Sequence, residues 1–145
     1  MCACAGEVTL LFKGPPAPDL PATRAGACHL LADRRARELD AAFDLDVLAQ
    51  MMGLTLARGW PDVLSNAVDP GSVPTKMGGA GAADDLEMGY LTQKWLAVSN
   101  DAAAAVSGGY WYHRQRQTPA QEARDPAFQD QLMDRLATLT GISLL

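Results

Sequence analysis

The chain has little cysteine, a deficit of basic charge and no long apolar run. Its three cysteines are an odd number, so they cannot form a complete disulfide framework. Twelve Lys and Arg against 17 Asp and Glu give a net charge of −5, which argues against nucleic-acid binding because that needs a basic surface. No stretch approaches the ~18 apolar residues of a membrane span. The apolar run at residues 8–12 is too short for a secretory signal. We therefore expect a cytoplasmic protein that binds neither nucleic acid nor membrane.

A zinc site is the sharpest alternative interpretation of the cysteines. Cys2, Cys4, Cys28 and His29 are residue types that bind zinc. However, cysteines separated by one residue are closer than in the usual structural zinc sites, and the adjacent Cys28 and His29 would hardly reach one tetrahedral ion together. We expect free, reduced thiols and no metal.

The composition changes near residue 44. Residues 1–43 are rich in Ala, Arg, Pro and Gly and form a divergent N-terminal segment, in which we expect a strand at 8–12 and a helix at 27–42. Residues 44–145 carry regular patterns. Apolar residues at helical spacing predict a buried helix over 44–59, with Asp44 as its N-cap. The β-prone run 63–68 then predicts a buried strand, cut off by Asp69, Pro70 and Gly71.

Three further elements follow. A helix is expected to begin at Asp84, which has capping-box spacing to Glu87, and one helical stripe on it consists of Met88, Leu91, Trp95 and Val98. Residues 106–112 predict a second strand. Asp125 and Pro126 begin a last helix that Gly141 ends, with one side formed by Phe128, Leu132, Leu136 and Leu139. Helices that alternate with strands in this way predict an α/β protein with a parallel sheet.

One motif resembles a known family. In residues 63–75, VLSNAVDPGSVPT, a strand ends in Asn-x-x-x-Pro-Gly-x-x-x-Thr. This resembles the segment after the sixth strand of the short-chain dehydrogenases/reductases. The surrounding segments ARGWPDV, KMGGAGAADD, LEMGYLTQKWLAVS and VSGGYWYH resemble the same family, in its order, so that the resemblance covers residues 44–145.

The resemblance implies an incomplete Rossmann-like, doubly wound parallel sheet, of which this chain supplies the C-terminal portion. It further implies an oxidoreductase that uses NAD or NADP on a small carbonyl or alcohol substrate and that forms a homo-oligomer. The implied cofactor contacts are Pro70, Gly71, Val73 and Thr75. A loop leaving a strand's carboxyl end in an open α/β sheet faces the ligand, and Gly71 permits close approach of its backbone.

The residues for catalysis are missing from this pattern. The family binds pyrophosphate with a T-G-x-x-x-G-x-G turn, and no such spacing occurs here. It transfers a proton with Tyr-x-x-x-Lys on the helix before the motif. Counting back by the family's usual length gives Ala42 and Asp46, or Phe43 and Val47, instead. We therefore assign no catalytic residue and expect the chain alone to lack activity.

Other residues could suggest chemistry. Tyr90 and Lys94 have the right spacing, but they follow the motif, and Met77 stands where the family's serine would precede them. A solvated helix face is the better interpretation of the pair. For His113, a surface loop is favoured over a general base.

Two alternatives to an oxidoreductase stay open. The chain is either a catalytically inactive fragment from a truncated or frame-shifted reading, or an interaction module whose unpaired sheet edge and apolar helix faces invite a partner.

Overall fold

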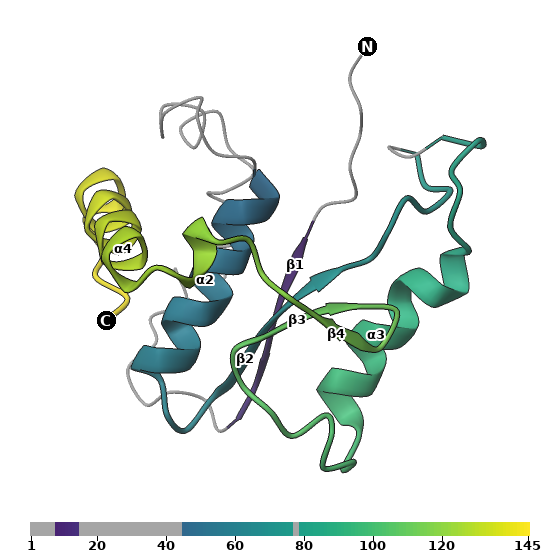
Figure 1. The fold of residues 1–145 in the computed structure, drawn as a ribbon, viewed down its shortest axis with the longest axis horizontal. Coiled ribbons are helices and arrows are strands. Elements are labelled where there is room, and N and C mark those ends of the chain that lie inside the picture. Colours follow the sequence, from purple (N-terminus) through teal and green to yellow (C-terminus); the bar gives the residue numbers. More distant parts are fainter. Residues whose placement is uncertain (1–7, 15–44, 77–78) are drawn as a thin grey trace.

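The structure is a computed structural model that describes residues 8–14, 45–76 and 79–145. Four strands form one sheet in the order β1 (Thr9–Lys13), β2 (Leu64–Asp69), β3 (Gly109–Tyr112) and β4 (Gln115–Gln117). The helices are α2 (Leu45–Gly59), α3 (Leu86–Val98) and α4 (Pro126–Thr140), with a short 3-10 helix η3 (Glu122–Arg124) before the last (Figure 1). The expected α/β class and its five elements after residue 44 are confirmed. The strand expected at 8–12 is β1, whereas the helix expected at 27–42 lies outside the described residues.

The sheet is mixed, so the expectation of an all-parallel sheet is wrong for the described strands. The central strands β2 and β3 are parallel, with Asn66 opposite Gly109 and Asp69 opposite Tyr112. Strand β1 runs antiparallel to β2, and β4 runs antiparallel to β3. The direction of β4 follows from its connection: His113 and Arg114, with φ of 46° and 62°, form a two-residue turn, and so short a turn joins only antiparallel strands.

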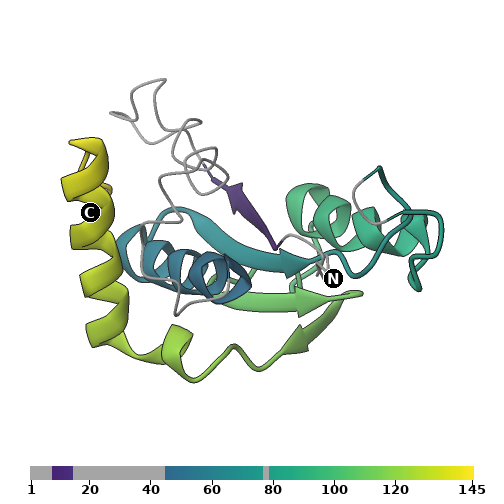
Figure 2. The same cartoon turned by 90° about the horizontal axis from the view of Figure 1, so that it is seen from above.

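Helices cover both faces of the sheet. Figures 1 and 2 show α2 and α4 on one side and α3 on the other. Successive side chains of β2 point to opposite faces of the sheet. Ser65 Oγ donates a hydrogen bond to the Gly53 carbonyl in α2 at 3.0 Å. Val68, by contrast, belongs to an apolar cluster with Trp111 and with Leu96 of α3. The described part of the chain is therefore a three-layer arrangement around the parallel pair.

Helix α2 is buried on several sides, as its sequence predicts. Leu48, Met51, Met52 and Leu56 are each at most 3% exposed. The first three form the main core cluster with Ala123 and Leu132. The expected N-cap of this helix, Asp44, lies outside the described residues.

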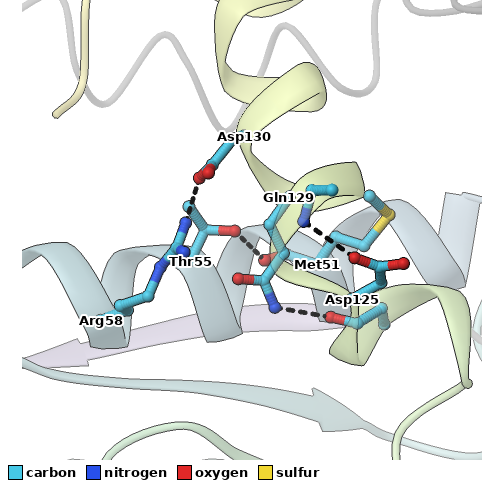
Figure 3. A network of polar contacts seen from close by, with 8 residues as sticks. Met51, Thr55, Arg58, Asp125, Gln129 and Asp130 are labelled. Carbon is cyan, nitrogen blue, oxygen red and sulfur yellow. Dashed lines mark hydrogen bonds and ion pairs between the residues drawn. The ribbon is translucent and has the colours of Figure 1, made fainter.

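Helix α4 packs on α2 as Figure 3 shows. The Asp125 carboxylate caps α4 by accepting the Ala127 N–H at 2.8 Å, and Gly141 ends the helix with φ of 70°, so both predicted caps are confirmed. Gln129, buried, donates to the Ala123 carbonyl at 2.8 Å. Arg58 and Asp130 form an ion pair, but their side chains are 44% and 61% exposed, so the pair adds little stability. Of the predicted apolar side, Leu132 is buried, whereas Phe128 is 39% exposed.

Helix α3 departs from its prediction in two ways. Its N-cap is Asp85, whose carboxylate accepts the N–H groups of Glu87 and Met88 at 2.7 and 3.3 Å, so the capping role expected of Asp84 is wrong. The buried residues of α3 are Gly89, Thr92 and Leu96, whereas Met88 and Val98 of the expected stripe are 37% and 69% exposed. Small residues let this helix approach the loop and sheet closely, and a pattern of large apolar residues does not reveal that face.

Candidate functional site

The candidate site is the loop at residues 70–75, which follows β2. Because β2 and β3 are parallel, their last residues, Asp69 and Tyr112, lie opposite each other at the same edge of the sheet. In Figure 2 the arrowheads of both strands point the same way, and the chain leaves β2 at this edge on its way to α3. Ligands of open α/β sheets bind outside the carboxyl ends of parallel strands. The 70–75 loop therefore occupies the position from which such a ligand is reached.

The turn into this loop requires a glycine. The Asp69 carboxylate accepts the Gly71 N–H at 2.8 Å, a turn that aspartate commonly makes with its own backbone. Gly71 has φ of +81°, a conformation that other residues rarely adopt. A Cβ atom at this position would also lie 2.6 Å from Asp84 Oδ2 and 3.2 Å from the Tyr112 ring. Both the backbone conformation and the lack of space for a Cβ atom therefore require a glycine at position 71.

Asp84 connects the loop to the end of β3. Its Oδ2 accepts the Ser72 N–H at 2.6 Å, and its Oδ1 accepts the Tyr112 hydroxyl at 2.9 Å. The Asp84 backbone N–H donates to the Ser72 carbonyl at 2.8 Å. The half-buried carboxylate thus joins three segments that are far apart in sequence.

These hydrogen bonds also shift the pKa values of Asp84 and Tyr112 in opposite directions. The Tyr112 hydroxyl, and after it the Ser72 N–H, lower the pKa of Asp84. The same Asp84 carboxylate, together with burial, raises the pKa of Tyr112. A general acid works best with a pKa near the operating pH. Tyr112 is therefore a poor proton donor, although it lies beside the loop.

Tyrosinate absorbance will test this contact. We expect Tyr112 to ionise above the ordinary value of about 10, and Asp84→Asn to move that ionisation to lower pH because it removes the main cause of the shift. Since the folded pKa is the higher one, the stability gained from the contact is complete below the unfolded pKa and is lost as pH rises through the folded pKa. Tyr112→Phe identifies the step that belongs to this residue. An unchanged titration curve in Asp84→Asn would rule out the contact.

The four residues expected to contact the cofactor lie together on this loop. Gly71 is buried, Pro70 and Val73 are half-buried, and Thr75 is exposed. Val73 packs against α3 so closely that a Cβ at Gly89 would lie 2.6 Å from Val73 Cγ1. The Thr75 N–H donates to the Val73 carbonyl at 2.8 Å.

The sequence alone did not assign Asp84 or Tyr112 to the site: Tyr112 could stack on a ligand, but a plain sheet core was the preferred interpretation of the run 110–112. For Asp84, the signal in the sequence is the Asp84-Asp85 pair, since a helix needs one N-cap and the second carboxylate is left for another partner.

The remaining candidates lie elsewhere or have structural partners. Tyr90 is 49% exposed and Lys94 is exposed on α3, as expected for a solvated helix face. His113 lies in the turn between β3 and β4, with its ring stacked on Tyr112 at 3.8 Å. Its Nε2 is shielded and has no hydrogen-bond partner among the described residues.

The positions counted back from the motif supply no catalytic pair. Asp46 is half-buried and accepts the Val8 N–H at 3.4 Å, and Val47 packs against the main core cluster. The alternative partners at 42 and 43 lie outside the described residues, as do Cys2, Cys4, Cys28 and His29.

No protein-family model, no curated protein and no solved structure matches the chain.

Within residues 8–14, 45–76 and 79–145, no three His, Cys, Asp or Glu side chains come together in a way that would hold a metal ion. In the same ranges, none of the helices has the length and apolar character needed to cross a membrane.

Proposed function

We propose that the 70–75 loop binds the nicotinamide end of NAD(H) or NADP(H), and that the chain is part of an oxidoreductase of the short-chain dehydrogenase/reductase type. Its substrate would be a small carbonyl or alcohol compound. The observation that carries the proposal is the placement of the Pro-Gly turn: it leaves a parallel strand at the sheet edge where α/β proteins bind ligands.

The surrounding elements support the same proposal. The order α2, β2, α3, β3, with helices on both sides of a parallel pair, is the repeat from which a Rossmann-like sheet is built. Strands β1 and β4, antiparallel at the edges, depart from that pattern. We propose that the described elements are the C-terminal portion of such a sheet.

Catalysis by this chain alone is not part of the proposal. Tyr-x-x-x-Lys occurs only on α3, where Tyr90 and Lys94 face solvent, and Tyr112 holds its proton through Asp84. In a complete enzyme the nicotinamide cofactor would exchange hydride with the substrate, and another part of the protein would have to supply the proton. We therefore expect cofactor binding without turnover.

Binding of NADH and NADPH to the purified chain tests the proposal. Energy transfer from tryptophan to the reduced nicotinamide gives the dissociation constant. Gly71→Val should weaken binding by at least about tenfold, because its side chain would displace Asp84 and the loop. Gly81→Val is the matched control, since a Cβ at Gly81 has no atom within 4 Å, and its affinity should equal that of the wild type. Absence of binding by the wild type at millimolar NADH and NADPH would overturn the proposal.

A second candidate is an interaction module, and the exposed face of α3 favours it. Leu86, Tyr90 and Val98, spaced by multiples of four residues on the helix, are 52%, 49% and 69% exposed. Lys94, which is also exposed, lies between Tyr90 and Val98 in this series, so the apolar side chains do not form one unbroken stripe. Exposed apolar side chains gathered on one helix are nevertheless typical of surfaces that bind a partner or a second copy. If the chain binds neither cofactor and sediments as a dimer, this second candidate is favoured.

A further inference from the structure

The 70–75 loop is held at three successive residues. Gly71 is bound through its N–H to Asp69, Val73 packs on Gly89, and Ser72 is bound through both of its backbone groups to Asp84. Asp69 belongs to the strand that feeds the loop, so its contact shapes the turn only locally. Asp84 is twelve residues further along the chain than Ser72, so its contact orients the loop relative to the rest of the molecule.

Helix α3 does not need the Asp84 carboxylate. Asp85 alone caps the helix, through the N–H groups of Glu87 and Met88. Both oxygens of Asp84 are directed elsewhere, one to the loop backbone and one to Tyr112 at the end of β3. Gly71 also has no Cβ where one would collide with Asp84 Oδ2, so the sequence leaves room for this contact.

We propose that Asp84 is a positioning residue for the cofactor: it fixes the backbone of the 70–75 loop against Tyr112, so that the loop presents its groups to the nicotinamide. This inference rests on the proposed function. Asp84 itself makes no contact with the cofactor in this scheme. Its carboxylate accepts a charge-assisted hydrogen bond from the loop, which is stronger than a neutral one and holds the loop in one orientation before the ligand arrives.

Two neighbouring aspartates allow a matched test. Asp84→Ser removes the carboxylate that reaches the loop. Asp85→Ser removes the same charge one residue away but keeps a good N-cap. We expect Asp84→Ser to weaken NADH binding by about tenfold and Asp85→Ser to change it by less than about twofold, measured well below the unfolding temperature. A merely structural Asp84 would lower the unfolding temperature in Asp84→Ser without changing the affinity of the folded protein.

Tyr112→Phe is the second variant, needed if Asp84→Ser does not fold. It removes one of the two hydrogen bonds and leaves the bond to Ser72, so NADH binding should weaken by about threefold.

Each outcome decides one claim. Equal affinities in Asp84→Ser and Asp85→Ser overturn the positioning role and leave the proposed function standing. If Asp84→Ser does not fold, a wild-type affinity for NADH in Tyr112→Phe overturns the positioning role instead, and it also leaves the proposed function standing. A wild type that binds no NADH overturns the proposed function, and this inference with it.

Discussion

Asn66→Leu is expected to lower the free energy of unfolding by about 3–5 kcal/mol, because it leaves two buried and one half-buried polar groups without partners. Asn66 is 3% exposed in the centre of β2. Its Oδ1 accepts the Gly109 N–H at 2.9 Å and the Trp111 Nε1–H at 3.2 Å. Its Nδ2 donates to the Val106 carbonyl at 2.8 Å. The Asn66 side chain thus supplies hydrogen-bond partners to polar groups in and just before β3, and it holds the parallel strands β2 and β3 in register.

Urea unfolding followed by circular dichroism measures this effect. Asn100→Leu makes the same chemical change at an exposed position after α3 and should alter stability by no more than about 0.5 kcal/mol. Similar losses in the two variants would mean that Asn66 is not the link between β2 and β3.

Met52→Ala is expected to cost about 2–5 kcal/mol, since it opens a cavity in the main core cluster. Met52 is 2% exposed and packs in one cluster with Leu48, Ala123 and Leu132, which come from α2, η3 and α4. The loss would therefore report on the docking of the C-terminal helix onto α2. Met52→Leu keeps the volume and should cost less than about 1.5 kcal/mol.

Met88→Ala is the matched control for this core substitution. Met88 is 37% exposed on α3, so its truncation should cost less than about 1 kcal/mol in the same unfolding experiment. A loss equal to that of Met52→Ala would contradict the placement of Met52 in the main core cluster and of Met88 at the surface.

Local signals predicted the elements after residue 44. The Asp125-Pro126 start and the Gly141 end of α4 depend on neighbouring residues alone, and they occur as expected. The long apolar pattern of α2 indicated burial on several sides, and the helix is buried in this way in the structure. The pairing of strands across the sheet could not be predicted from such local signals. Nothing in the residues of β1 indicates that it pairs antiparallel with β2, because strand direction depends on the path of the intervening chain.

The candidate site was predicted in part. The Pro-Gly turn after a β-prone run places Pro70, Gly71, Val73 and Thr75 at the end of a strand, where the structure has them. The Asp84–Tyr112 contact joins residues 28 positions apart. It depends on the parallel register that brings Tyr112 opposite Asp69 and on Asp85 taking over the cap. Both features depend on the tertiary fold, so no local sequence pattern predicts them.

An NMR titration of the isotopically labelled chain with NADH tests the central claim most directly. If the loop after β2 binds the nicotinamide, the largest amide shifts should belong to Gly71, Ser72, Val73 and Thr75, with smaller ones at the end of β3. Absence of shifts at millimolar NADH, or shifts confined to α4 on the far side of α2, would contradict it.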